Sequence, residues 1–237
     1  MKSIYIIILI FFIYSFIGWF NEVIIQLINK KKFINRGFLI GPICPIYGFG
    51  GTLIILLLRR YENDPLILFI MAIIICSIIE YFTSYFMEKI FKNRWWDYSD
   101  KKFNINGRIC LECAIPFGIL GVIGYYGLNP LLTNILNIFS EKALMVITII
   151  LCTTWIVDTI ISFKVILNLK NISSKINSDS TEAITKKVKE ILLNKNVLNR
   201  RLVKSFPNME VFNRMYILKE KYLKEKNKIK RKKKTGK

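Results

Sequence analysis

The sequence contains no histidine and only five cysteines. Histidine is the usual general base near neutral pH, and its absence counts against the common forms of acid–base catalysis. Cys110 and Cys113 have the CxxC spacing of zinc and redox sites, but no second CxxC pair accompanies them. We therefore interpret the cysteines as small residues that pack between helices, and we expect no metal site, no cofactor and no catalytic residue.

The sequence also lacks the motif G-x-x-x-x-G-K-[S/T]. Many ATPases use this motif to form the loop that holds the phosphates of ATP. We therefore expect that this chain carries no ATPase of its own.

Apolar and basic residues are both abundant, but they occupy different parts of the chain. Of 237 residues 53% are hydrophobic, and the formal net charge is +20. Residues 1–167 are mainly apolar, whereas residues 168–237 contain 21 Lys or Arg and 6 Asp or Glu. This division predicts a membrane domain (1–167) followed by a basic, partly helical cytoplasmic tail (168–237) with a disordered end.

The membrane domain contains five apolar segments, each near the ~20 residues that a helix needs to cross ~30 Å of hydrocarbon. We predict an all-α, polytopic membrane protein with five transmembrane helices. The predicted spans are residues 4–28, 38–58, 66–86, 109–128 and 143–167.

Lysine and arginine are distributed unevenly among the predicted loops. The first and third loops together contain ten, whereas the N-terminus, the second loop and the fourth loop together contain four. Because basic loops stay in the cytoplasm, we expect the N-terminus outside and the C-terminus inside. This orientation also puts the basic tail in the cytoplasm.

The second predicted span is interrupted by helix-breaking residues. Residues 35–51 read NRGFLIGPICPIYGFGG and include Pro42, Pro45 and five glycines. Proline removes a backbone donor and disturbs the preceding turn. Broken backbone inside a membrane is tolerated only where protein or a water-lined cavity satisfies it. We therefore expect an irregular helix beside an internal polar site.

Acidic residues interrupt three of the other spans. Glu22, Glu80 and Asp158 all lie in the predicted cytoplasmic half of the membrane, where a lipid-facing charge costs at least about 2.5 kcal/mol. We therefore predict a polar cavity that is open to the cytoplasm. Its candidate residues are Glu22, Asn35, Arg36, Gly37, Pro42, Pro45, Tyr47, Glu80, Glu88, Asp97, Asn106, Arg108 and Asp158.

The third predicted loop is rich in aromatic and charged residues. Trp95, Trp96 and Tyr98 suit a membrane interface, where aromatic rings meet lipid headgroups. Alternatively, this loop forms the floor of the cavity. Its arginines, Arg94 and Arg108, and Arg36 in the first loop could pair with Glu22, Glu80 or Glu88, or bind an anionic group.

Two hairpins of spans share a weak pattern. Asn35 precedes Pro45 by ten residues, and Asn106 precedes Pro116 by the same number. The spacing suggests a parallel internal repeat with a site at the interface of its halves. A chance match explains the spacing equally well.

The tail is expected to contain two helices and to end in the polybasic stretch KIKRKKKTGK. Such a stretch attracts anionic lipid headgroups, at about 1 kcal/mol for each basic residue near the surface. Nucleic acid is a weaker alternative, because no stacking or groove-reading motif accompanies the charge.

Several blocks of the sequence resemble one known family. FIYSFIGWFNE (12–22), NRGFLIGPICPIYGFGG, EYFTSYFMEKIF (80–91), RWWDYS and FNINGRICLE are similar to the ABC-transporter permease family called CmpB-like, or ABC-transporter type IV. The resemblance implies a multi-pass permease component of a bacterial cell membrane. It also implies a separate ATPase subunit as partner, and five spans are few enough that we expect self-association into a homo-oligomer.

Two other functions remain open from the sequence. The acids and arginines could serve a membrane-embedded enzyme that modifies lipids, although the chain has no recognisable nucleophile arrangement. The basic tail could instead recruit partners to a non-catalytic membrane regulator or assembly factor.

Overall fold

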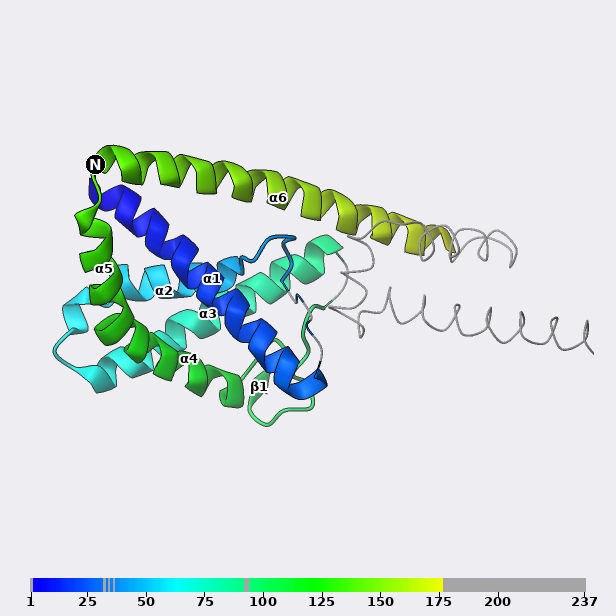
Figure 1. Ribbon diagram of the computed structural model, residues 1–237. Coiled ribbons are helices and arrows are strands. Elements are labelled where there is room, and N and C mark those ends of the chain that lie inside the picture. Colours follow the sequence, from blue (N-terminus) through cyan, green and yellow to red (C-terminus); the bar gives the residue numbers. More distant parts are fainter. Residues whose placement is uncertain (1, 32, 34, 36, 92–93, 177–237) are drawn as a thin grey trace, which may run out of the picture. The chain divides into compact units, whose positions relative to one another are not determined.

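The computed structural model describes the chain except residues 1, 32, 34, 36, 92–93 and 177–237 (Figure 1). The predicted tail beyond residue 176, with its two helices and polybasic end, and Arg36 therefore lie outside the described residues. The elements are α1 (Lys2–Lys30), α2 (Pro45–Leu57), η1 (Arg59–Tyr61), α3 (Pro65–Phe91), β1 (Asn104–Ile105), β2 (Ile109–Cys110), α4 (Leu111–Ile123), η2 (Gly124–Leu128), α5 (Asn129–Ile138) and α6 (Glu141–Ile176).

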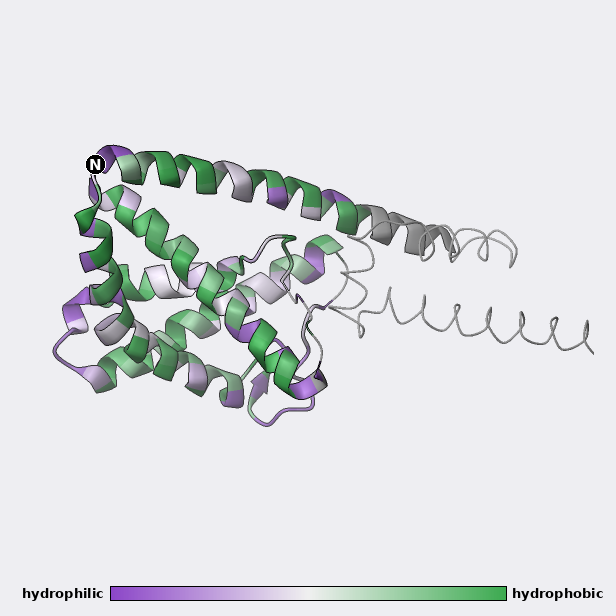
Figure 2. Ribbon diagram, viewed as in Figure 1, coloured by the Kyte–Doolittle hydropathy of each residue, from purple (hydrophilic) through white to green (hydrophobic). Residues whose placement is uncertain are grey.

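Four helical stretches are long and apolar enough to cross a membrane. They are Lys2–Asn29, Pro65–Phe91, Leu111–Ile138 and Glu141–Leu167. Apolar residues predominate along α1, α3 and α4, and hydrophilic residues concentrate in the connecting segments (Figure 2). A helix satisfies its backbone hydrogen bonds internally, which is why such runs are helical in lipid. The helical, multi-pass character that the sequence predicts is confirmed.

The second predicted span, residues 38–58, is not a helix of membrane length. Only its second half, α2, is helical, and 13 residues rise only about 20 Å. Residues 37–44 form bends and extended backbone. Pro45 lies in the first turn of α2, where its missing N–H costs no hydrogen bond. The break therefore falls where the prolines predict it.

Helix α2 packs closely against α1 and runs antiparallel to it (Figure 1). The Cys44 backbone N–H donates to the Ser15 carbonyl oxygen at 3.0 Å, which positions the start of α2 near the middle of α1. A Cβ at Gly48 would overlap Ser15 Oγ and the Phe11 carbonyl oxygen. Glycine at this position lets the two backbones approach.

The fourth apolar stretch is longer than predicted. Helix α4 continues through the π-helical turn η2 into α5, so the stretch reaches Ile138 rather than residue 128. The apolar stretch extends past residue 128 because Pro130 lies in the first turn of α5, where proline does not interrupt the helix. Lys142 lies in the first turn of α6 rather than in a loop.

The third loop contains a small β-hairpin, which the all-α prediction omitted. Asn104 pairs with Cys110, and Ile105 with Ile109, in antiparallel register. Asn106 and Gly107 form the turn with positive φ angles of 53° and 67°, a geometry that asparagine and glycine adopt most readily.

Side-chain contacts show which loops and helix ends lie near one another. The Phe38 ring contacts the rings of Phe91 and Trp95 at centroid distances of 5.7 and 5.4 Å, which joins the first and third loops. At the start of α1, Lys2 Nζ donates a hydrogen bond to the carbonyl oxygen of Asn137 in α5. The first and third loops are therefore neighbours, and the start of α1 lies beside the end of α5.

The buried core is small, and much apolar surface stays exposed. One cluster joins Ile6, Leu9, Ile10, Leu136 and Leu144, and a second joins Ile54, Leu58, Leu68 and Ala72. Only 17% of the most apolar part of α3 is buried. Lipid, rather than water, is the surrounding that suits such a surface.

Candidate functional site

Glu22 and Tyr47 connect α1 to α2. The Tyr47 hydroxyl donates to Glu22 Oε1 at 2.8 Å. Both side chains are partly buried, Glu22 in the membrane-length helix α1 and Tyr47 in the shorter apolar helix α2. A hydrogen bond to a carboxylate is stronger than one between neutral groups. This contact turns the acid of α1 toward the protein.

Asn35 forms hydrogen bonds with α1 and with the unwound segment that follows it. Its Oδ1 accepts hydrogen bonds from Trp19 Nε1 at 2.8 Å and from the Gly37 backbone N–H at 3.2 Å. Its Nδ2 donates to the carbonyl oxygen of Ile40 at 3.1 Å. One side-chain amide thus satisfies the indole of α1 and two backbone groups of the unwound segment.

Asp158 holds the same segment from α6. Its Oδ1 accepts the backbone N–H of Ile40 at 2.9 Å, and its Oδ2 accepts that of Gly41 at 2.8 Å. Both N–H groups lie in non-helical backbone, where no helical carbonyl is available to them. The carboxylate therefore supplies the acceptors that the broken helix lacks.

Glu80 lies on α3 and is 95% buried. The Tyr98 hydroxyl of the third loop donates to Glu80 Oε1 at 3.2 Å. Burial, and then the charge of Glu80, raise the pKa of Tyr98, so its phenol stays protonated at neutral pH and remains a donor. The carboxyl groups of Glu80 and Glu22 are close enough to interact electrostatically.

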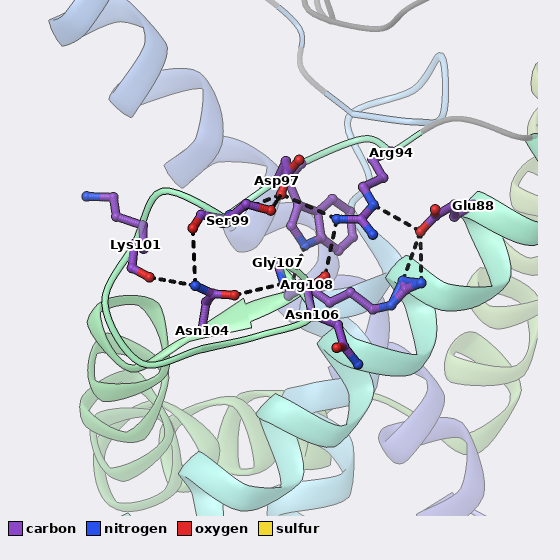
Figure 3. Close-up of polar contacts among 10 residues, drawn as sticks. Glu88, Arg94, Asp97, Ser99, Lys101, Asn104, Asn106, Gly107 and Arg108 are labelled. Atoms are coloured by element: carbon purple, nitrogen blue, oxygen red, sulfur yellow. Dashed lines mark hydrogen bonds and ion pairs between the residues drawn. The ribbon is translucent and has the colours of Figure 1, made fainter.

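Glu88, at the end of α3, binds two arginines of the third loop (Figure 3). Its Oε2 lies 3.1 Å from Arg94 Nε and 2.9 Å from Arg108 Nη2. The Arg108 guanidinium also lies over the rings of Tyr81 and Tyr85, at 5.5 and 5.4 Å from their centroids. These contacts fix the third loop to α3.

Asp97 and Asn104 shape the turns of that loop (Figure 3). Asp97 Oδ1 accepts the backbone N–H and the hydroxyl of Ser99, and these bonds lower the pKa of Asp97. Asn104 Oδ1 accepts the backbone N–H of Gly107. A Cβ at Gly107 would overlap Asp97 and Ser99, so the loop closes tightly on itself.

The sequence matches one known protein family. A family model described as "Putative ABC-transporter type IV" matches residues 9–163, well over half of the chain. The chain belongs to this family. Searches of curated proteins and of solved structures return no match. All the acidic residues described above lie inside the region that matches the type IV family, and the basic tail lies outside it.

The candidate residues form two neighbouring groups in this type IV chain. The first group surrounds the unwound segment and contains Glu22, Asn35, Gly37, Tyr47 and Asp158. The second surrounds the third loop and contains Glu80, Glu88, Asp97, Asn106 and Arg108. Pro42 is exposed, and Pro45 begins α2.

The three aromatic residues expected at the membrane interface contact the protein itself. Trp95 is buried and packs against Phe38 and Phe91. Trp96 Nε1 donates to the Arg108 carbonyl oxygen at 3.0 Å. Together with the Tyr98 bond to Glu80, these contacts make the aromatic side chains part of the loop's internal structure.

Sequence reasoning missed several partners of these residues. Trp19, Tyr81, Tyr85 and Ser99 were not predicted at the site. Tyr81, Tyr85 and Glu88 recur at helical spacing on one face of α3, a pattern that is visible in the sequence. The two prolines of the suspected repeat also differ, because Pro45 starts a helix whereas Pro116 lies inside α4.

Among the described residues, no three His, Cys, Asp or Glu side chains are grouped so that they could hold a metal ion. The chemistry that the two groups offer is hydrogen bonding and proton exchange. Glu22 and Glu80 each accept a hydrogen bond from a tyrosine hydroxyl, and Asp158 accepts the backbone N–H groups of Ile40 and Gly41 in the unwound segment.

Proposed function

We propose that the chain is the permease subunit of an ABC transporter in a bacterial cell membrane, with no ATPase of its own. The family match supports the transporter role. The permease role is supported above all by two hydrogen bonds. Glu22 and Glu80 lie inside membrane-length helices, and each accepts a hydrogen bond from a tyrosine of another segment. Acids that face lipid cost at least about 2.5 kcal/mol, so acids turned inward suit a polar path.

The proposed membrane topology has five crossings. The second crossing consists of the unwound residues 37–44 in one half of the membrane and α2 in the other. Its support is the antiparallel course of α2 along α1 from Ser15 toward the N-terminal end. The basic first and third loops then face the cytoplasm, with the N-terminus outside and the C-terminus inside.

The substrate path is proposed to open between the two polar groups on the cytoplasmic side. Unwound segments in transporters expose backbone groups to the substrate and can change conformation as a helix cannot. Residues 37–44 fit this role because the side chain of Asp158, on another helix, holds the backbone N–H groups of Ile40 and Gly41. Releasing Asp158 would loosen the segment without breaking a regular helix.

The proposed partners follow from what the chain would need. A separate ATPase subunit would bind to the cytoplasmic loops or tail, and a second copy of the chain would complete the path. The basic tail would bind anionic lipid headgroups.

The direct test is to purify the protein in mild detergent at its native expression level and to identify what co-purifies. We expect a stoichiometric subunit that carries an ATPase phosphate loop. A matched sample with the substitution Glu88→Gln, which removes the carboxylate that binds the third loop to α3, should retain less of that subunit. A sample with Glu141→Gln, in the exposed first turn of α6, should retain all of it. An intact native assembly without any ATPase would overturn the proposal.

A further inference from the structure

Cys110 and Cys113 form a close pair at the start of α4. Cys110 precedes the first turn of the helix, and Cys113 lies within that turn. The Cys110 thiol donates to Cys113 Sγ, and the two sulfur atoms are 3.1 Å apart. Both are free thiols. A disulfide needs a sulfur separation of about 2.05 Å, so a shift of about 1 Å would join them.

The pair lies beside the polar site. The Cys113 thiol interacts with the Tyr98 hydroxyl, and Tyr98 in turn donates to Glu80. The thiol pair therefore lies next to the hydrogen bond between Tyr98 and Glu80. The packing role expected from the sequence does not account for this arrangement.

The two sulfur atoms differ in access. Cys110 is 98% buried, whereas Cys113 is partly exposed. The neighbouring ion pair between Lys101 Nζ and Glu112 Oε2 is exposed on both sides. Charged side chains that are this exposed indicate an aqueous surface next to Cys113. A small water-soluble reagent can therefore reach Cys113 before Cys110.

We propose that Cys110 and Cys113 are a reversible dithiol–disulfide pair that exchanges with small-molecule disulfides. The Cys113 thiolate attacks one sulfur of the disulfide RSSR, which forms a mixed disulfide and releases one thiolate, RS⁻. The Cys110 thiolate then attacks Cys113 Sγ, which forms the Cys110–Cys113 bond and releases the second RS⁻. The two cysteine protons end on the two RS⁻ groups, so two thiols and RSSR give one protein disulfide and two RSH.

This modification site is independent of the permease role. It requires only the geometry of the third loop and of the first turn of α4. Oxidation replaces the Cys113 thiol beside Tyr98 with a disulfide sulfur, and it therefore changes the surroundings of the hydrogen bond between Tyr98 and Glu80.

The test uses the full-length protein in native membranes and oxidised glutathione as the disulfide. After exposure, free thiols are blocked with an alkylating reagent, and peptides are identified by mass spectrometry. We expect a peptide that contains both cysteines, has lost two hydrogens, and returns to the dithiol form after reduction. The matched variant Cys110→Ser lacks the resolving thiol, so it should accumulate glutathione on Cys113 several-fold above the wild type.

Three results would overturn the proposal. Both thiols could remain open to alkylation after exposure to the oxidant. The wild type could retain as much glutathione on Cys113 as Cys110→Ser does. Cys113 could instead pair with Cys44, Cys76 or Cys152, which the same peptide map would reveal.

Discussion

The carboxylate of Asp158 on α6 accepts the backbone N–H of Gly41 at 2.8 Å, across 117 residues of sequence. Its other oxygen accepts the N–H of Ile40. An acid that lies within a membrane-length helix thereby replaces the helical carbonyls that the unwound segment lacks. The relation explains both why the segment can be irregular and why a charged group is present in α6.

Substituting Asp158→Asn should destabilise the protein by about 1–3 kcal/mol, because one amide oxygen cannot replace two carboxylate oxygens as acceptors. Unfolding of the purified protein in detergent by a graded denaturant measures this change. Labelling of Cys44, the last residue of the segment, should also become faster. The exposed Asp100→Asn is the control and should change neither quantity. Equal stability of the two variants would contradict the role of Asp158.

Glycine at position 48 is required for the contact between α1 and α2. Gly48→Ala places a Cβ against Ser15 Oγ and the Phe11 carbonyl oxygen, and it should destabilise the protein by about 1–3 kcal/mol. Gly127→Ala is the matched control, because a Cβ there meets no atom within 4 Å. Alanine is the better helix former by up to about 1 kcal/mol, so the control should be neutral or stabilising. Comparable losses in both variants would contradict the close packing at Gly48.

Glu88→Gln should loosen the third loop, because Arg94 and Arg108 share this carboxylate. Loss of charged hydrogen bonds of this kind costs about 1.5–3 kcal/mol. Limited proteolysis between residues 94 and 110 reports on the loop. Glu112→Gln removes the exposed bond to Lys101 and should have little effect. The interpretation fails if the two variants behave alike.

The stability of the loop should depend on pH through Asp97. Hydrogen bonds from Ser99 lower the pKa of Asp97 below its ordinary value of 3.8. The folded loop therefore favours the ionised carboxylate, and its contribution is complete at neutral pH and is lost as the pH falls below about 4. Proteolysis of wild type and Asp97→Asn between pH 7 and pH 3 measures this. The difference between them should shrink on acidification, and a constant difference would contradict the assignment.

Local patterns in the sequence predicted most of the helices. The runs at 4–28, 66–86 and 143–167 correspond to α1, α3 and α6, because apolar length alone decides such helices. Pro42 and Pro45 correctly predicted the break in the second segment. The length of α2 and the continuation through Pro130 depend on local backbone geometry that residue counts do not resolve. The hairpin at Asn104–Cys110 was missed because its strands have only two residues each.

The site was predictable only as a set of residue types. Acids within apolar runs indicated that Glu22, Glu80 and Asp158 face the protein. Their partners could not be predicted, because each bond joins segments that are distant in sequence: Tyr47 to Glu22 across 25 residues and Gly41 to Asp158 across 117. The glycines at 18 and 48 are the signal that the two helices approach closely there, but they do not specify which hydroxyl meets which acid.

The proposed role of Glu22 and Glu80 is to form a working polar site inside the membrane. The most direct measurement is complementation of a deletion strain by the double variant Glu22→Gln/Glu80→Gln, at a protein level matched to wild type, with Glu141→Gln as the exposed control. We expect the control to restore function fully and the double variant to be present in the membrane and to fail. Full complementation by the double variant would contradict a working polar site at Glu22 and Glu80.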